Sequence, residues 1–423
     1  MPSHSPTPHS SKAPLQVLTN VTLAHQGQQQ SPYHVVIEDG LITDVSQHAP
    51  SHLLLQRDDV QLIDVQGHIL SAGLIDAQIN GALGCDFNHC TTHQLKDTLK
   101  RLPQFGITSI LPTVITAPLE DMLAAIQTIE EAIRQWEPGM CRIAGIHLEG
   151  PFLNPQHNGI HPKEAMDPQQ INAETLRQLI SPHTKLITLA PEMVVDQGFI
   201  AQLNEQGITV FAGHTGATSP QMTDAIAQGL CGVTHLFNAM KPFHHRAPGV
   251  IGSALTHPKL TVSIIVDGVH VYPEALRLAF HAKNQDTLML VSDAMHLAGT
   301  PNGTQATFAG QSITHQDGKA VGPNGELAGA ICMLPACVQN VSNWHLATFA
   351  QALHMASTTP ATVLNLPDIG QITPKYVADL VLWDKTHQTI LGTWLQGDLV
   401  HYTGKVSLPG LPQPKYAAKQ LSA

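Results

Sequence analysis

The feature that most constrains this fold is a regular alternation of apolar runs and helical patterns through the middle of the chain. Most of the runs are almost continuously apolar, as expected of parallel strands that are buried on both faces. We count eight of them, near Ala72–Asn80, Ile107–Thr113, Arg142–Glu149, Lys185–Pro191, Ile208–His214, Cys231–Phe237, Thr261–Asp267 and Leu288–Asp293.

Helical patterns lie between these runs. They include Thr91–Arg101, Leu119–Trp136, Glu174–Leu179, Gln221–Gln228 and Pro273–Ala282. Pro118 and Pro273 stand where the first turn of a helix tolerates proline. Alternating strands and helices indicate an α/β fold with a parallel sheet, and eight repeats favour closure into a (β/α)₈ TIM-like barrel over an open doubly wound sheet.

The two ends of the chain show short alternating runs divided by turn residues. One run, His34–Ile42, contains the turn pair Asp39-Gly40, and similar runs return at Ala378–Asp384 and Thr389–Asp398. Neither end alone supplies enough strands for an independent core, so we expect both to form one small β-sandwich domain. The predicted division is a disordered N-terminal tail at 1–14, the β-sandwich domain from 15–70 and 370–404, the catalytic barrel at 71–369, and a weakly ordered C-terminal tail at 405–423.

Composition excludes several classes of protein. A hydrophobic content of 43% and a charged content of 13% indicate a compact globular chain. A net charge of −11 without a basic stripe argues against binding to nucleic acid or to an anionic membrane. Met1–Ala13 lacks the apolar core of a secretory signal, and the six cysteines form no CxxC pair. We therefore expect a cytoplasmic protein in a reducing compartment.

Three of the apolar runs end in residues that can bind a metal. Glu149, His214 and His235 end the third, fifth and sixth runs. A catalytic zinc site uses three protein ligands drawn from histidine and carboxylate, and barrel active sites are built at the C-terminal ends of the strands. Each residue taken alone is equally compatible with a hydrogen-bonded strand end. Their repetition along the chain predicts a metal site.

Two further strand ends carry polar groups. Asp293 ends the eighth run, where a carboxylate beside a metal site can take a proton from water and return it to a leaving amine. A helix N-cap is the alternative role for this residue. Gln78 and Asn80 lie on one face of the first strand. Because amides are weaker metal ligands than imidazole, we expect these two to hydrogen-bond water or substrate.

Loops after the sixth and seventh strands offer an anion site. The first, Asn238–Arg246, brings backbone donors and the guanidinium of Arg246, and the second is Asp267–His270. Together they can hold a phosphate or carboxylate, with Arg246 as a fork-like donor. A solvated loop is the alternative. The His157–His161 segment contains Gly159 and is predicted to be a loop over the mouth of the barrel.

In combination these motifs resemble the N-acetylglucosamine-6-phosphate deacetylases, a family of the amidohydrolase superfamily. The resemblance extends from about Leu15 to Tyr402, and the pairing of HLEGP with THLFNAM is its most specific part. The matching stretches are Ala72–Gly81, His147–Pro151, Ala212–Thr215, Thr234–Met240, Asp267–His270 and Ser292–Ala294.

The resemblance implies hydrolysis of the acetamide of N-acetylglucosamine 6-phosphate to acetate and glucosamine 6-phosphate, in amino-sugar catabolism or recycling. It implies that Glu149, His214 and His235 bind the divalent metal. Asp293 would activate the water and then protonate the amine. His161 resembles the family's loop histidine, which contacts the substrate near its acetamide.

The resemblance also locates the phosphate end of the substrate. Asn238, the backbone of Ala239, Arg246 and His270 resemble the family's phosphate-side contacts. Some of these contacts come from the adjacent subunit in the family, which implies a homodimer. A sugar phosphate is then the expected partner, with no nucleic acid or membrane.

One departure from the wider superfamily concerns the metal count. Many amidohydrolases carry His-x-His on the first strand and bind two metals, whereas Gln78-Ile-Asn80 stands here. We therefore predict one metal, with Zn²⁺ expected and Fe²⁺, Mn²⁺ or Co²⁺ also suited to these ligands. The alternatives are another amidohydrolase, such as a D-aminoacylase or a dihydroorotase-like enzyme, and a non-catalytic barrel that has lost its metal.

Overall fold

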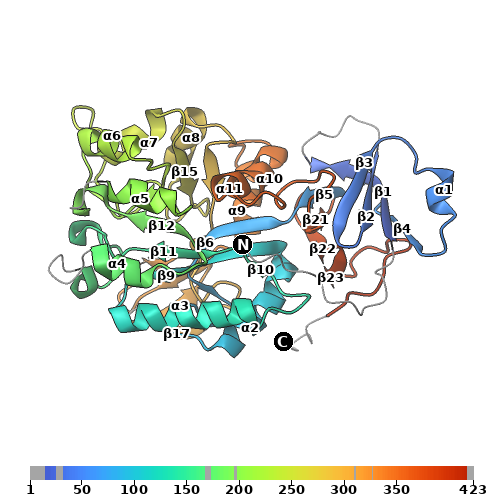
Figure 1. Ribbon diagram of the computed structural model, residues 1–423, viewed down its shortest axis with the longest axis horizontal. Helices are drawn as coiled ribbons and strands as arrows, with labels where there is room; N and C mark the ends of the chain where they lie inside the picture. The colour runs from blue at the N-terminus through green and yellow to red at the C-terminus, as the bar shows by residue number, and fades with distance from the viewer. Residues whose placement is uncertain are drawn as a thin grey trace.

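The protein consists of a barrel and a separate sheet domain that lie side by side (Figure 1). A computed structural model describes residues 15–416, apart from 25–31, 167–172, 195–197, 309–310 and 326. The predicted N-terminal tail at 1–14 and the end of the predicted C-terminal tail, 417–423, lie outside the described residues.

Eight parallel strands form the barrel, and each pairs with its neighbour from β6 through β9 and on to β16. They are β6 (Leu74–Ile79), β9 (Ile107–Ile115), β11 (Ile146–Glu149), β12 (Thr184–Leu189), β13 (Thr209–Ala212), β14 (Gly232–Val233), β15 (Thr261–Ile264) and β16 (Leu288–Leu290). A parallel bridge between Ile79 and Ala294 joins the last strand to the first. The prediction of a (β/α)₈ barrel is confirmed.

The apolar runs form strands because both faces of each strand are covered. All nine residues of β9 are buried, including the polar Thr108, Ser109 and Thr113, so this mostly apolar strand is covered on both faces. A short strand, β10 (Arg142–Ile143), pairs with β9 at the edge of this sheet. In α3 (Leu119–Arg134) the buried side chains recur at helical spacing, at Met122, Ala125, Ile126, Ile129 and Ala132.

Helices surround the strands, and the predicted helical segments are observed. They are α2 (Thr92–Arg101), α3, α4 (Ala173–Leu179), α6 (Ser219–Ala227) and α8 (Pro273–Ala282). Six other helices of the described ranges were not among those named from the sequence: α1 (His52–Leu55), α5 (Phe199–Glu205), α7 (Gly249–Thr256), α9 (Leu334–Asn343), α10 (Phe349–Ala356) and α11 (Thr358–Val363).

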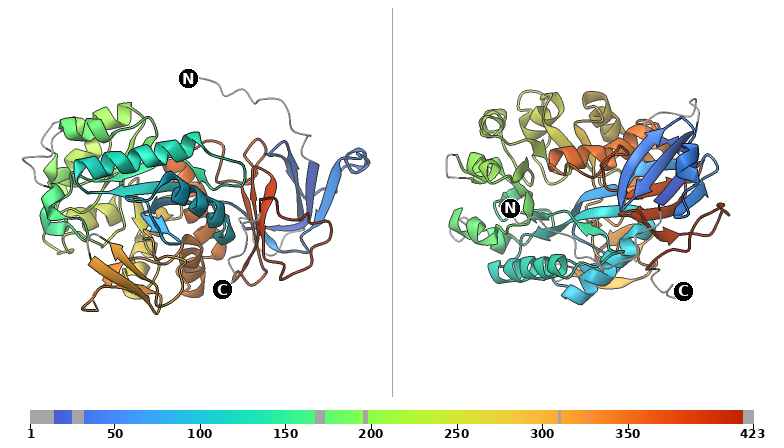
Figure 2. Two further views of the ribbon diagram at one scale, coloured as in Figure 1. Left: turned by 90° about the horizontal axis from the view of Figure 1, so that it is seen from below. Right: turned by 45° about the vertical axis from the view of Figure 1, so that its right-hand side comes forward.

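A small antiparallel sheet between β16 and α9 was also not predicted. Its strands are β17 (Gln305–Phe308), β18 (Gln311–Gln316), β19 (Lys319–Val321) and β20 (Leu327–Gly329). Figure 2 shows this sheet in orange, projecting from one side of the barrel. The turn pair Asp317-Gly318 between β18 and β19 has positive φ at both residues, as a two-residue hairpin requires.

Both ends of the chain build the second domain. Its strands are β1 (Leu15–Leu23), β2 (Tyr33–Glu38), β3 (Leu41–Ser46), β4 (Val60–Asp64), β5 (Ile69–Ala72), β21 (Leu380–Trp383), β22 (Ile390–Leu395) and β23 (Asp398–Tyr402). Antiparallel pairing of β5 with β21 joins the two ends, and Leu18, Leu70, Leu382 and Trp394 share one buried cluster. The division of the chain at 70/71 and 369/370 stays a prediction.

Part of the segment after residue 404 contacts the sheet domain, and the weak order expected of this segment stays a prediction. The N–H of Asp64 donates to the carbonyl of Pro409 at 3.0 Å, and that of Lys415 donates to Leu399 at 2.7 Å. Leu408 is buried in the cluster of the sheet domain. This polar, proline-containing segment therefore lies against the sheet domain, because its backbone groups form hydrogen bonds with that domain.

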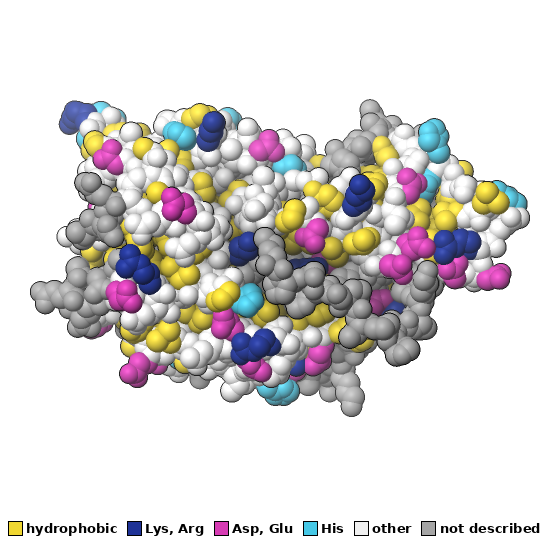
Figure 3. All heavy atoms as spheres, viewed as in Figure 1, with side chains coloured by type: hydrophobic (Ala, Val, Ile, Leu, Met, Phe, Trp, Pro, Cys, Tyr) yellow, Lys and Arg dark blue, Asp and Glu magenta, His cyan; other side chains and the backbone are white. Residues whose placement is uncertain are grey.

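The surface agrees with the charge argument from composition. On the face shown in Figure 3, acidic and basic side chains are interspersed and form no basic stripe. Within the described ranges, no helix has both the length and the apolar character needed to cross a bilayer.

Candidate metal centre and catalytic cavity

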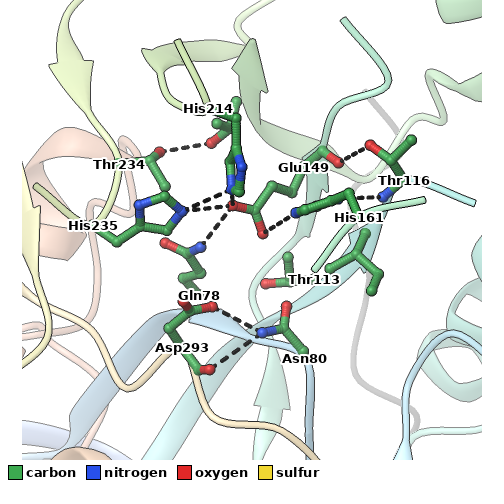
Figure 4. A network of polar contacts seen from close by, with 12 residues as sticks. Gln78, Asn80, Thr113, Thr116, Glu149, His161, His214, Thr234, His235 and Asp293 are labelled. Carbon is green, nitrogen blue, oxygen red and sulfur yellow. Dashed lines mark hydrogen bonds and ion pairs between the residues drawn. The ribbon is translucent and has the colours of Figure 1, made fainter. Parts of the chain in front are cut away.

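Three side chains converge at the C-terminal end of the barrel (Figure 4). Glu149 ends β11, and His214 and His235 follow β13 and β14. The Oε1 atom of Glu149 lies 3.1 Å from the Nε2 atom of His214 and 3.0 Å from that of His235. The two Nε2 atoms are 3.0 Å apart. All three residues are buried.

The chemistry of this donor set fits a divalent cation. The Nδ1 atom of His214 lies 2.9 Å from the carbonyl oxygen of His157 and donates to it. A neutral imidazole has one N–H, so the Nε2 atom of His214 directs a lone pair at the centre of the cluster. One carboxylate oxygen and two ring nitrogens within 4.8 Å of one another are the ligand types of a catalytic zinc site.

Sharp backbone turns aim these side chains. His214 has φ 48°, His235 has φ 30° and Asp293 has φ 49°. Non-glycine residues rarely adopt this left-handed region, and such outliers concentrate at functional sites, where the surrounding structure enforces them. Each of the three lies two or three residues beyond the end of a barrel strand.

Asp293 lies at the edge of this cluster, facing the first strand. Its Oδ1 atom accepts a hydrogen bond from the Nδ2 atom of Asn80 at 2.8 Å. The dense protein surroundings raise the pKa of the Asp293 carboxyl to about 6, and the negative charge of Glu149 adds to the effect. A carboxyl with this pKa can both accept and return a proton near neutral pH.

His161 approaches the cluster from the loop after β11. Its Nδ1 atom accepts the backbone N–H of Thr116 at 3.2 Å, so its Nε2 atom carries the proton and lies 4.0 Å from the Oε2 atom of Glu149. Burial lowers the pKa of His161 to about 3, with the neighbouring His214 adding to the effect. His161 is therefore a neutral N–H donor at the site.

The two amides of the first strand both face carboxylates. Gln78 Nε2 donates to Glu149 Oε1 at 3.1 Å, and Asn80 Nδ2 donates to Asp293. Amide nitrogens cannot act as ligands for a cation in this arrangement. Gln78 does not line the cavity described below. Its side chain contacts the carboxylate of Glu149 instead.

A cavity of about 650 Å³ opens over the cluster, a size typical of small-molecule sites. Nine predicted site residues line it: Asn80, Glu149, His161, His214, His235, Asn238, Ala239, His270 and Asp293. His270 pairs with Asp267 at 2.6 Å, and this hydrogen bond keeps the pKa of Asp267 below its usual range although burial opposes it. Arg246 is exposed and is not among the lining residues.

Other residues of the cavity were missed from the sequence. Phe308, Gln311 and Ile313 of the small β17–β20 sheet line one wall, and the Asp317-Gly318 turn pair was the signal that could have revealed that sheet. Lys163 is the one lysine or arginine among the described residues that line the cavity. Its position two residues after His161 was the only sequence signal for it.

Comparison with known proteins agrees with this architecture. The sequence pattern of the Amidohydrolase family matches residues 69–408. The chain belongs to this family. Amidohydrolases are metal-dependent hydrolases, and the family membership inferred from the sequence is confirmed.

Individual relatives are similar over most of their length. The chain is 34% identical to N-acetylglucosamine-6-phosphate deacetylase of Bacillus subtilis (strain 168), covering 85% of this chain and 90% of the relative. It is 35% identical to N-acetylgalactosamine-6-phosphate deacetylase of Shewanella sp. (strain ANA-3), over 78% and 83%. The crystal structure of N-acetylglucosamine-6-phosphate deacetylase from Pasteurella multocida superposes with a TM-score of 0.81 at 30% identity, over 91% and 99%.

Proposed function

We propose that this protein hydrolyses N-acetylglucosamine 6-phosphate to glucosamine 6-phosphate and acetate, in amino-sugar catabolism or recycling. The observation that carries the proposal is the convergence of Glu149, His214, His235, Asp293 and His161 on one cavity. The relatives with this activity in their names support the choice of substrate.

One divalent cation, Zn²⁺ before Fe²⁺, Mn²⁺ or Co²⁺, would be held by Glu149, His214 and His235. Such a cation polarises an acyl carbonyl and makes a water molecule more acidic. A single cation is supported by the residues of the first strand, where Gln78 and Asn80 stand in place of two histidines and donate their amide N–H groups to carboxylates. This argues against the two-metal arrangement with His-x-His on the first strand.

Proton transfer in the proposed reaction is assigned to Asp293. Its carboxylate removes a proton from the attacking water and then delivers it to the sugar nitrogen, so that an amine leaves. Asn80 holds the carboxylate by its Oδ1 atom, which leaves the second oxygen for the proton. His161, neutral with its proton on Nε2, donates a hydrogen bond to the acyl group and stabilises the negative charge that develops on its oxygen.

The phosphate end of the substrate is assigned to the opposite group of loops. Asn238, the backbone of Ala239 and His270 line the cavity there. Arg246 is exposed outside the cavity of its own chain. We therefore assign it to the phosphate of a neighbouring subunit in a homodimer, where its planar guanidinium suits a phosphate. A cytoplasmic location belongs to the same proposal and is supported by the six unpaired cysteines.

A second candidate substrate is N-acetylgalactosamine 6-phosphate. Two relatives, 32% and 35% identical to this chain, are N-acetylgalactosamine-6-phosphate deacetylases. The two sugars differ only in the configuration at C4, away from the acetamide and the phosphate. The same catalytic groups therefore serve both, and the preference depends on contacts to the ring.

The test is elemental analysis of the purified protein together with an acetate-release assay. The assay compares the two 6-phosphates with unphosphorylated N-acetylglucosamine. The proposal expects about one metal per chain, release of acetate from N-acetylglucosamine 6-phosphate, and a much lower kcat/KM without the phosphate. Equal rates on the phosphorylated and unphosphorylated sugars would refute the assignment of a phosphate-binding end to the cavity. A faster reaction with N-acetylgalactosamine 6-phosphate would make that sugar the proposed substrate.

A further inference from the structure

Glu192 is a half-buried carboxylate beside the metal cluster that does not line the cavity. It lies in η5 (Pro191–Met193), directly after β12. Its Oε1 atom accepts the backbone N–H of Gly216 at 2.6 Å and the Nδ2 atom of Asn154 at 2.9 Å. Its Oε2 atom accepts the hydroxyl of Thr215 at 2.5 Å. One carboxylate thus holds two loops that come from different strands.

The first of these loops carries a metal-site histidine. Thr215 and Gly216 directly follow His214, whose φ of 48° is in the left-handed region. A histidine keeps this conformation only where the surrounding structure enforces it. Hydrogen bonds from the next two residues to one fixed carboxylate supply such enforcement.

The second loop orients the ring of the same histidine. His214 Nδ1 donates to the carbonyl of His157, the last residue of η3 (Pro155–His157). Asn154 is the N-cap of that short helix, and its Oδ1 atom accepts the N–H of Gln156 at 2.9 Å. The other end of the same amide donates to Glu192. The position of the His157 carbonyl is therefore linked to Glu192 through Asn154.

The two loops also lie close to each other at Gly216. A Cβ atom at Gly216 would lie 2.9 Å from the Nε2 atom of His157 and 3.6 Å from the Nδ2 atom of Asn154. The N–H of Asn154 donates to the carbonyl of His214 at 2.9 Å, which closes the arrangement. By contrast, the Nδ1 atom of His235 is buried without a hydrogen-bond partner among the described residues.

We propose that Glu192 is a positioning residue for the metal ligand His214, fixing both its backbone turn and the tautomer of its ring. The inference rests on the metal site of the proposed function. Groups that orient a ligating histidine pre-organise its lone pair, and their loss typically weakens metal binding by about 10–100-fold. Glu192 does this from the end of β12, a strand that contributes no ligand to the described cluster.

The test measures the Kd of Zn²⁺ for metal-free protein by competition with a chromophoric chelator, in the absence of substrate. Glu192→Ala removes all three acceptor contacts, so a Kd about 10–100-fold weaker than wild type is expected. Glu192→Gln keeps an amide oxygen for Gly216 and Asn154 and turns its NH₂ toward the Thr215 hydroxyl, so its Kd is expected to recover most of that loss. Glu130→Ala is the matched control, because Glu130 is a half-buried glutamate on α3 whose contact is with His183 at 3.4 Å.

A purely structural role predicts a different pattern. If Glu192→Ala lowers the Tm but binds Zn²⁺ within about twofold of wild type, the positioning role is overturned. If that variant does not fold, Thr215→Val removes the hydroxyl that donates to Glu192 and accepts the N–H of Ala217, at nearly constant shape. An unchanged Kd in this variant would overturn the inference in the same way. Wild-type protein that binds Zn²⁺ but releases no acetate would instead overturn the proposed function, and the comparison of Kd values would still decide the role of Glu192.

Discussion

Replacing Asp293 by asparagine separates proton transfer from the rest of the site. The substitution exchanges one carboxylate oxygen for an NH₂ group of similar size. Asn80 donates to the Oδ1 atom of Asp293 at 2.8 Å and to its backbone carbonyl at 3.2 Å. Both acceptors remain in the variant, because the side-chain amide keeps an Oδ1 atom and the backbone is unchanged. Because Glu149, His214 and His235 form the metal cluster, we expect the variant to keep its metal.

The expected loss follows from the proton transfers that the amide cannot perform. General acid–base catalysis by a positioned side chain contributes about 10²–10⁴-fold, and each factor of ten equals about 1.36 kcal/mol of activation free energy. Asp293 serves twice in the proposed reaction, as base and then as acid, so we expect the upper part of the range, about 4–5 kcal/mol. Of the other carboxylates that line the cavity, Glu149 is engaged by two histidines and Glu164 is exposed.

The same assignment fixes the sign of the pH dependence. Asp293 acts first as a base, so kcat/KM falls as pH drops through its pKa. Burial and the charge of Glu149 raise that pKa to about 6, and a bound cation would lower it by favouring the ionised form. The acidic limb of the kcat/KM profile is therefore expected at or below pH ~6.

The assay is acetate release across pH 4.5–9, with metal content measured on the same samples. Asp286→Asn is the matched control, because Asp286 forms an exposed ion pair with His354 at 2.9 Å. An Asp293→Asn variant with full metal and a kcat/KM within tenfold of wild type would refute the assignment. An acidic limb centred above pH 7 would show that the carboxyl of Asp293 is not the group that controls it.

Three further predictions concern other parts of the molecule. Asp76 is fully buried, with burial raising its pKa to about 7, so the folded state holds a proton that the unfolded state loses near pH ~3.9. The contribution of this group to the free energy of unfolding is therefore fully present below pH ~4, and it declines by up to about 4 kcal/mol as the pH rises to ~7. Asp76→Asn should therefore raise the Tm relative to wild type more at pH 8 than at pH 5, and a constant difference would contradict the reasoning. Removing the metal with a chelator should abolish acetate release and lower the Tm, with about 2.7 kcal/mol of stabilisation regained at a free metal concentration of 100 Kd; full activity in metal-free protein would exclude the metal site. Arg246→Ala should raise KM for N-acetylglucosamine 6-phosphate about tenfold or more with little change in kcat, and an unchanged KM would place the phosphate elsewhere.

Much of the barrel could be predicted because its strands are locally distinctive. The segment that forms β9 is mostly apolar, with only small Thr and Ser residues at its polar positions, because a parallel strand covered on both faces has no solvent-exposed side. The β17–β20 sheet was missed because its strands are short and largely exposed, as in Gln305–Phe308, so no long apolar pattern marks them. The contact of the segment after 404 with β4 could not be predicted from a local pattern, because β4 is distant from it in sequence.

The candidate site divides in the same way. Glu149, His214, His235 and Asp293 could be found because each follows an apolar run, and a barrel brings all such ends to one face. Glu192 follows an apolar run too, but its significance lies in three hydrogen bonds to other loops. Those partners lie 23 to 38 positions away along the chain, and no spacing rule connects them.

The barrel, its family and the residue types of a candidate metal site could be inferred from the sequence alone, because strand periodicity and strand-end chemistry are local properties. Which of those groups meet depends on the tertiary structure. It brought nine predicted residues to one cavity, turned the amides of Gln78 and Asn80 toward carboxylates, and left Arg246 exposed outside. Distances and tautomers depend on contacts between loops, and these contacts exist only once the barrel has closed.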